Sequence, residues 1–136
     1  MKIAHLQHGD PDLWTSLGEM MVSRIVHKEL GGPIYSVHGT HWWVATERGK
    51  VLGFASLRPT ESAVWHDYDY VVESARHRGV HAGLADARDA FAAETWPSKP
   101  ARVVVRVERW KHYKKRGWQV ERQRGSWVYG IRESAP

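Results

Sequence analysis

The sequence predicts one α/β domain with a mixed, mostly antiparallel central sheet of about six to seven strands flanked by helices. Short apolar and aromatic runs recur along the chain between glycine- and proline-containing turns, as expected of strands. Two longer segments carry apolar residues every three to four positions, which is the helical period. The 136 residues, 42% of them hydrophobic, suffice for one core, and no linker or repeat divides them.

The N-terminal part predicts a strand followed by a helix. Residues 1–7 form the strand. Asp10 and Pro11 mark the helix start, because aspartate caps the free N–H groups of a first turn and proline fits its first position. Apolar residues then recur at helical spacing as far as Ile25, and the glycine pair before Pro33 ends the helix.

The middle part predicts three strands, two of them in a hairpin. Residues 41–47 and 50–57 are apolar runs on either side of a short turn at Arg48 and Gly49, so they pair antiparallel. Residues 63–73 form a longer extended run that is rich in β-branched and aromatic side chains.

The C-terminal part begins with a change of period. From Gly79 the apolar residues follow a 3.6-residue rhythm that ends at Pro97, so the third extended run leads directly into an amphipathic helix. The elements expected after it are a buried strand at 102–107, a short helix that stops at Gly117, and two closing strands at 118–122 and 127–132.

Composition excludes several classes of protein. Without cysteine the chain has no disulfide, no thiol nucleophile and no cysteine-bound metal. No window approaches the ~18 consecutive apolar residues that cross a bilayer, and the first ten residues lack a signal peptide's apolar run, so we expect a cytoplasmic protein without a membrane partner. Only His38 and His41 lie at a plausible ligand spacing, so we predict no metal site.

Positive charge is concentrated in the last third of the chain. From Ala101 onward there are ten lysines and arginines against three acidic residues, whereas the first hundred residues are slightly acidic. Such a segment either forms a solvated face that keeps a small domain in solution or attracts a polyanion. The candidate polyanions are the phosphates of a cofactor, a nucleic acid and an acidic protein.

The most informative segment lies where the third extended run meets the helix, over residues 71–84. A helix N-terminus presents unpaired backbone N–H groups and a partial positive charge, so it binds phosphate when the preceding loop allows close approach. Gly79 allows that approach, Gly83 lets the first turn pack closely, and Arg76 and Arg78 add charge-assisted contacts to the same anion.

This segment resembles the cofactor motif of the GNAT superfamily of N-acetyltransferases, which is Arg/Gln-x-x-Gly-x-Gly/Ala after a strand that ends in valine. Residues 76–81 match the motif with Val71 in register, except that His81 stands where the family usually has glycine or alanine. The order of elements is also similar to the family's from Lys2 to Arg132.

The resemblance implies acetyl-CoA as co-substrate and a sheet that splays between its fourth and fifth strands. The splay frees backbone N–H groups for the thioester carbonyl and the pantetheine arm. His81 would lie near the pyrophosphate, where it either donates a hydrogen bond or narrows the pocket. The cofactor-binding residues implied in this way are Val71, Val72, Arg76, His77, Arg78, Gly79, Val80, His81 and Ala82.

A second similarity to the family lies near the chain end, where residues 113–118 resemble its Tyr-x-x-x-Gly-Phe motif. The resemblance implies that Tyr113 lies beside the cofactor sulfur and protonates the departing thiolate. The asparagine that the family usually carries about seven residues earlier is absent, and Arg106 stands there. The alternative for Tyr113 is an aromatic residue packed on the sheet with its hydroxyl in water.

A general base is expected on the extended run itself. Asp67 and Asp69 share one face of an otherwise aromatic strand, and burying an isolated carboxylate is costly. We predict that one of them is the base or the electrostatic partner of the amine, and that their proximity raises one pKa. The alternatives are that both face solvent or pair with arginines of a neighbouring strand, and that His66, with an ordinary pKa of ~6.5, is the base.

The function predicted from these residues and from the resemblance is transfer of an acetyl group from acetyl-CoA to a primary amine of a small molecule or polypeptide. A second hypothesis is a nucleic-acid-directed acyltransferase that docks through the basic C-terminal third. A third is a module that binds coenzyme A without turnover. The resemblance also suggests a homodimer.

Overall fold

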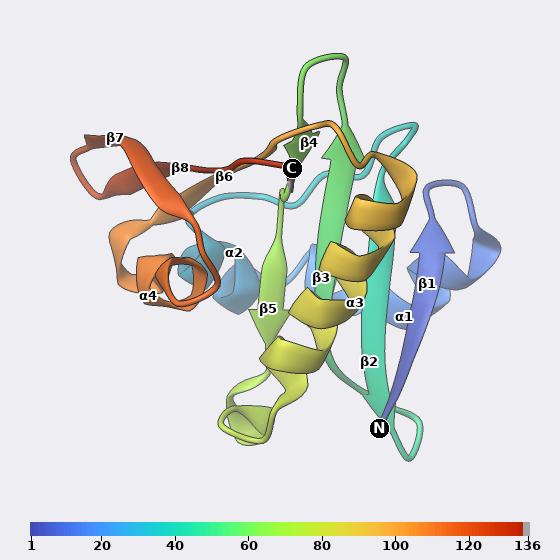
Figure 1. Ribbon diagram of the computed structural model, residues 1–136. Helices are drawn as coiled ribbons and strands as arrows, with labels where there is room; N and C mark the ends of the chain where they lie inside the picture. The colour runs from blue at the N-terminus through green and yellow to red at the C-terminus, as the bar shows by residue number, and fades with distance from the viewer. Residues whose placement is uncertain (135–136) are drawn as a thin grey trace.

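The computed structural model describes residues 1–134 and shows an open eight-stranded sheet with helices on both faces (Figure 1). The strands are β1 (Lys2–Gln7), β2 (His41–Glu47), β3 (Lys50–Pro59), β4 (Val64–Trp65), β5 (Asp69–Val71), β6 (Ala101–Arg106), β7 (Gln119–Arg124) and β8 (Trp127–Arg132). The helices are α1 (Pro11–Met21), α2 (Arg24–Leu30), α3 (Val80–Thr95) and α4 (Trp110–Lys114), with 3-10 turns at Glu73–Ala75 and Val107–Arg109.

The strands lie in the order β1-β2-β3-β4-β6-β8-β7, and β5 pairs with β3 beside β4. Every pairing is antiparallel except that of β4 with β6, which is parallel. This confirms the predicted fold class, a mixed and mostly antiparallel sheet flanked by helices. None of the helices within residues 1–134 is both long and apolar enough to span a membrane.

The sequence prediction of one strand over residues 63–73 is wrong, and this adds an eighth strand. β4 pairs with the end of β3 and β5 with its middle, and residues 66–68 between them are not in a strand. The Ser56 hydroxyl explains the break, because it accepts the Tyr68 N–H at 3.1 Å while the Ser56 N–H donates to the Tyr68 carbonyl at 2.9 Å.

The single helix predicted over residues 10–30 is also interrupted, and the break lies at Val22 and Ser23. The Ser23 hydroxyl caps a new helix by accepting the Val26 N–H at 3.4 Å. The prediction that the glycine pair ends this region is confirmed, since Gly31 takes a left-handed φ of 91° at the end of α2. Apolar spacing continues through both helices, so periodicity alone did not reveal the break.

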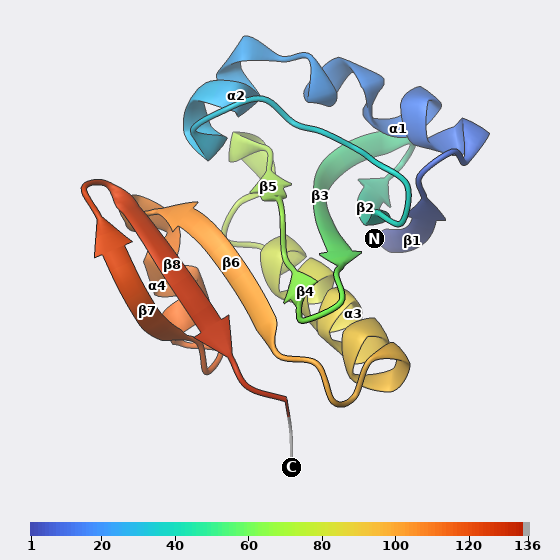
Figure 2. The same ribbon diagram turned by 90° about the horizontal axis from the view of Figure 1, so that it is seen from above.

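Apolar side chains form three clusters that follow the layers. Helices α1 and α2 cover one face of the sheet over Trp42 and Phe54, and α3 covers the other over Trp43 and Leu57 (Figure 2). A third cluster lies where α4 packs on the C-terminal strands. Its members are Ala101, Val103, Val105, Tyr113 and Trp118, with Trp110 packed against them.

The sheet opens between β5 and β6. The two halves pair at Val64 with Ala101 and at Trp65 with Arg102, and the His66 N–H then donates to the Arg102 carbonyl at 2.9 Å. Beyond this point β5 stays with β3 while β6 turns away with β8, and Figure 2 shows the strands diverging. The predicted splay between the strand that carries Val71 and the next strand is therefore present.

Candidate active site

Backbone groups of β5 point into the opening of the sheet. The Val72 N–H donates to the Leu52 carbonyl at 2.9 Å, and the Tyr68 carbonyl accepts from Ser56, so the even-numbered residues bond to β3. Because hydrogen-bonded and non-bonded pairs alternate along an antiparallel ladder, the N–H groups of Asp69 and Val71 point away from β3. These two donors face the gap, where an oxygen or a second strand-like chain could accept from them.

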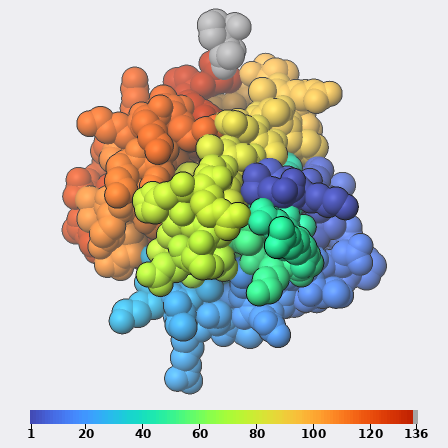
Figure 3. All heavy atoms as spheres, turned by 90° about the horizontal axis from the view of Figure 1, so that it is seen from below, coloured from blue at the N-terminus to red at the C-terminus, as the bar shows by residue number. Residues whose placement is uncertain are grey.

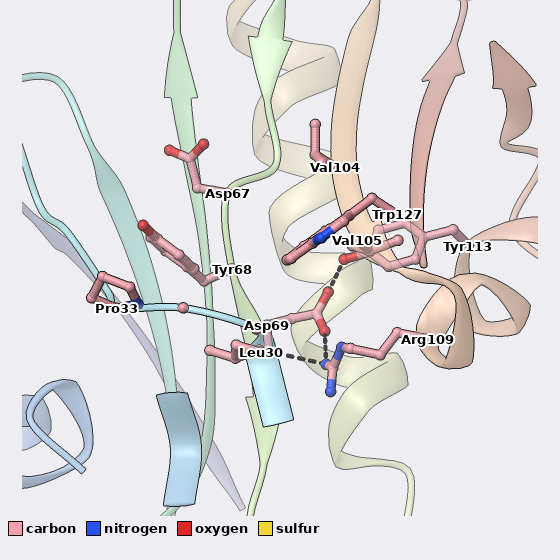
Figure 4. Close-up of a pocket in the computed structure, with 12 residues that line it drawn as sticks. Leu30, Pro33, Asp67, Tyr68, Asp69, Val104, Val105, Arg109, Tyr113 and Trp127 are labelled. Carbon is pink, nitrogen blue, oxygen red and sulfur yellow. Dashed lines mark hydrogen bonds and ion pairs between the residues drawn. The ribbon is translucent and has the colours of Figure 1, made fainter. Parts of the chain in front are cut away.

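Asp69 is the centre of a buried ionic network at this gap, as Figure 4 shows in part. Its carboxylate accepts from Arg109 at 2.5 Å, from Arg88 at 3.4 Å and from the Tyr113 hydroxyl, while its carbonyl accepts from Arg109 at 2.7 Å. Asp69 is 3% exposed and Arg88 is 2% exposed. The network ties β5 to α3 and to the segment leading into α4.

This surrounding keeps Asp69 ionised. Burial would raise the pKa of the carboxyl, but His81, Arg109 and Arg88 oppose it and hold that pKa well below its ordinary value. A carboxylate so strongly stabilised is a poor base. Asp69 instead contacts Arg88, Arg109 and Tyr113 at once and holds these three side chains together.

Tyr113 lies at the same point with its hydroxyl facing Asp69. The side chain is buried and packs edge to face on Trp118, with ring centroids 5.5 Å apart. Burial and the negative charge of Asp69 raise the pKa of the Tyr113 phenol far above its ordinary value. The phenol is thus protonated throughout the neutral range, and its hydroxyl is hydrogen-bonded inside the protein instead of projecting into water.

A cleft of about 460 Å³ lies between the loop before α3 and α4. In Figure 3 the loop and the first turn of α3, in yellow-green, lie beside the orange segment that contains α4. Of the residues predicted to bind the cofactor, six line this cleft: Val71, Arg76, His77, Gly79, His81 and Ala82. The Val80 side chain is in the core, and neither Val72 nor Arg78 lines the cleft.

Gly79 gives the loop its shape. It caps α3 with a left-handed φ of 81°, and a Cβ there would meet nothing within 4 Å. His77 also has a positive φ, of 64°. The space beside Gly79 at the start of α3 is therefore open, and the first N–H groups of a helix have no partner within it, which suits an anion.

The two arginines predicted to bind the phosphates, Arg76 and Arg78, instead form ion pairs with acidic side chains of the protein. Arg76 donates through Nε to the Val71 carbonyl at 2.9 Å and through an Nη atom to Glu29 at 2.5 Å, so it ties the end of β5 to α2. Arg78 pairs with Glu47 at 3.2 Å on the surface. Glu29 was missed in the sequence because its contact with Arg76 spans 47 positions.

His81 lines the cleft, and its imidazole points toward Asp69. Its Nε2 atom lies 3.5 Å from Asp69 Oδ1, and its ring centroid is 5.0 Å from that of His112 on α4. Nε2 has no hydrogen-bond partner among residues 1–134. The imidazole therefore lines the cleft beside the Asp69 network.

A second cleft, of about 220 Å³, opens on the side of α2 (Figure 4). Leu30, Pro33, Tyr68 and Trp127 are among its apolar and aromatic walls. Asp69 and Tyr113 also line it, and Arg109 lines both clefts, so the two approach each other at the gap.

Asp67 lines this second cleft and pairs with Arg58 of β3, with Nε 3.1 Å from the carboxylate. Burial raises the pKa of Asp67, and Arg58 offsets only part of that effect. The surroundings of the two acids thus shift their pKa values in opposite directions, upward for Asp67 and downward for Asp69. The alternative that the acids pair with arginines of a neighbouring strand holds for Asp67 only, because Arg88 and Arg109, the partners of Asp69, lie on α3 and on the 3-10 turn before α4. Burial is the largest cause of the raised pKa of Asp67.

His66, the alternative base, is enclosed. Neither ring nitrogen has a hydrogen-bond partner among residues 1–134, and the ring packs on Trp118 at 5.0 Å. Burial and the charge of Arg88 hold the pKa of His66 well below its ordinary value. A neutral ring without access to either cleft is a weak candidate for proton abstraction.

Arg88 is a residue of the buried network that the sequence analysis did not predict. It lies four positions after Leu84 and three before Phe91, on the apolar face of α3, and a charged residue at that place signals a buried partner. It also donates to the carbonyls of Ser56 and Tyr68, at 3.1 and 3.0 Å.

Five of the ten lysines and arginines in the basic C-terminal third pair with acidic side chains, namely Arg102, Arg106, Arg109, Arg116 and Arg132. Arg109 bonds Asp69, and Arg116 bonds Asp86 and Asp89 at 2.8 and 2.9 Å. Arg122 lies over the ring of Tyr129. Within residues 1–134 no cluster of three or more ligating side chains could hold a metal ion.

Comparison with known proteins gives structural similarity only. No family model and no curated protein sequence matches the chain. Among solved structures, ElaA of Escherichia coli superposes with a TM-score of 0.83 and 14% identity, covering 98% of this chain and 100% of that one. The chain has the GNAT fold.

Two further structures with the GNAT fold are similar over nearly their full lengths. An acyl-CoA N-acyltransferase from Pseudomonas aeruginosa has a TM-score of 0.80 and 17% identity, with 96% of this chain and 98% of that chain covered. The PaiA N-acetyltransferase from Thermoplasma acidophilum, in complex with coenzyme A, has a TM-score of 0.72 and 15% identity, with 98% and 99% covered. The resemblance seen in the sequence is confirmed for the fold.

Proposed function

We propose that the protein transfers an acetyl group from acetyl-CoA to a primary amine of a small molecule or polypeptide. The observation that carries this proposal is the approach of two clefts, which share Arg109 in their linings, at the gap where the Val71 N–H points. Structures of the same fold include a coenzyme A complex and named N-acyltransferases, which supports the assignment.

The cleft beside α4 fits coenzyme A. Its volume of about 460 Å³ and its cationic lining suit a long polyanion, and the open space before Gly79 accommodates a phosphate against backbone N–H groups. We assign the phosphates to the first N–H groups of α3, at Val80, His81 and Ala82, and the pantetheine arm to the free edge of β5. Acetyl-CoA would supply a thioester carbonyl that an amine attacks and from which a thiolate leaves.

The Val71 N–H is the proposed donor for the oxygen of that carbonyl. It belongs to a strand fixed by β3 and needs no rearrangement to face the gap, so it is preorganised for the charge that develops there. The acceptor amine enters through the cleft on the α2 side. Asp67 serves there as the base or electrostatic partner of the amine, since its pKa is raised and it lines that cleft.

Tyr113 is the proposed proton carrier between amine and sulfur. The strongly raised pKa of the Tyr113 phenol means that a phenolate beside Asp69 is unfavourable in free energy. Tyr113 therefore gives its proton to the departing sulfur as it takes one from the acceptor nitrogen, which loses a proton on becoming an amide. Asp69, Arg109 and Arg88 hold the phenol at the gap during this exchange.

Calorimetric titration with acetyl-CoA and with desulfo-CoA tests the proposal, followed by release of free thiol with a panel of amines. We expect micromolar binding of both ligands and amine-dependent thiol release. The chain contains no cysteine, so a thiol-reactive dye reports only released coenzyme A. Failure of both ligands to bind would overturn the proposal, and binding without release across a broad panel would favour a non-catalytic module.

A further inference from the structure

The wall of the cofactor cleft formed by α4 and its C-cap carries two lysines without an ion pair in the part of the chain that the structure describes. Lys111 of α4 and Lys115, the residue that caps the C-terminal end of this helix, lie four positions apart on the same side, and both line the cleft. Neither has an ion-pair partner among residues 1–134. Both side chains are exposed, so an incoming anion does not have to displace a partner from them.

The other cations around the cleft are already paired. Arg109 is bonded to Asp69, Arg116 to the acids of α3, and Arg76 to Glu29 and the Val71 carbonyl. A phosphate near Arg76 would have to compete with a carboxylate 2.5 Å away. The free charge of the cleft therefore lies on α4, opposite the loop.

We propose that Lys111 and Lys115 of α4 bind the phosphate groups of coenzyme A, and that Arg76 acts as a structural tie of the opposite wall. This inference rests on the proposed function, because it takes coenzyme A as the ligand. The loop contributes backbone N–H groups and α4 contributes the charges, so the phosphates lie between the two walls. A lysine ammonium suits this role because it contacts phosphate as a compact point charge.

Lys114 is a matched control on the same helix. It is exposed like Lys111 and Lys115 but does not line the cleft. Replacing it removes the same charge from the protein, so general electrostatic attraction falls equally in all three single variants. Only a direct contact separates Lys111→Ala and Lys115→Ala from Lys114→Ala.

The experiment measures the affinity for coenzyme A by calorimetry at two salt concentrations, for wild type, the three single variants and the Lys111→Ala/Lys115→Ala double variant. Exposed charge-assisted contacts predict about a fivefold loss for each cleft lysine and a larger loss for the double variant. Lys114→Ala stays within about twofold of wild type. The double variant should also show a weaker dependence on salt, because fewer charges contact the ligand.

Ligand fragments identify the phosphate involved. If the lysines hold the 3′-phosphate, wild type and the double variant bind dephospho-CoA with equal affinity. If they hold the pyrophosphate, the double variant binds dephospho-CoA more weakly than wild type does. Both results support the proposal. Equal binding of coenzyme A by the double variant and wild type would overturn it while leaving the proposed function intact. The proposal would also be overturned if Lys111→Ala and Lys115→Ala lost no more affinity for coenzyme A than Lys114→Ala. Failure of wild type to bind coenzyme A would refute the proposed function itself.

Discussion

Replacing Asp69 with asparagine tests the central network directly. The carboxylate accepts hydrogen bonds from Arg88, Arg109 and Tyr113, and asparagine keeps its size but turns one acceptor into a donor. At least one charge-assisted bond is lost, and Arg88, 2% exposed, remains buried without a counter-charge. Breaking a buried pair of this kind costs about 3–5 kcal/mol in the free energy of unfolding. In a domain of this size that lowers Tm by about 10–20 °C.

The pH dependence of this loss has a definite sign. The pKa of Asp69 is lower in the folded protein than in the unfolded chain, so its stabilisation is complete above the ordinary aspartate pKa of ~3.9 and declines below it. Urea unfolding of wild type and variant should therefore differ by a constant amount from about pH 5 to 8. The difference should shrink toward pH 3.

Asp67→Asn is the matched control for this measurement. Asp67 is also a carboxylate paired with an arginine, but its side chain is 21% exposed and that of Arg58 is 34% exposed. Such a pair contributes about 0–1 kcal/mol. If Asp69→Asn unfolds within about 1 kcal/mol of wild type, or no more easily than Asp67→Asn, the ionised network described above is not what holds β5 to α4.

Three further outcomes follow from the geometry. Tyr113→Phe should leave the affinity for coenzyme A within about twofold of wild type and lower amine-dependent thiol release at least tenfold. Loss of the hydroxyl should also cost about 1–2 kcal/mol in the free energy of unfolding. Equal losses in affinity and release would show that the residue has a structural role only. Gly79→Ala should cost about 1–2 kcal/mol through its positive φ and also weaken coenzyme A binding, which calorimetry would detect, since the methyl enters the cleft. Gly53→Ala should lower Tm, measured by circular dichroism, by several degrees, because a Cβ would lie 2.4 Å from the Tyr70 carbonyl oxygen, and an unchanged Tm would refute that contact.

The sequence predicted those parts of the fold that local patterns determine. The hairpin of β2 and β3, the start of α3 at Gly79 and the strand β6 each follow from a turn residue or a period within a few positions. Two boundaries were wrong because a single hydroxyl decides each of them. Ser23 starts a new helix inside a continuous apolar pattern, and Ser56 interrupts a run that alternates like one strand.

The candidate site was predicted in outline only. The sequence placed Tyr113 and Asp69 in one site, and the structure brings them into contact across 44 positions. It could not show that Arg76 meets Glu29, or that Arg88 reaches Asp69, because those pairings depend on how α2 and α3 pack on the sheet. The roles assigned to Asp67, Tyr113 and the cofactor loop stay predictions until binding and turnover are measured.

The opening of the sheet also affects which parts of the molecule unfold locally. Residues 101–132 have their own apolar cluster and their own antiparallel strands, and they pair with the N-terminal sheet over only two residues of β4. We expect them to unfold together as one sub-global unit, which native-state hydrogen exchange can resolve. The pantetheine arm of coenzyme A, lying in the gap, would contact both residues 101–132 and the N-terminal sheet, like a strand added between them. At a hundredfold excess over Kd it would add about 2.7 kcal/mol to the cost of their separation, so amides of β7 and β8, remote from the cleft, would exchange more slowly.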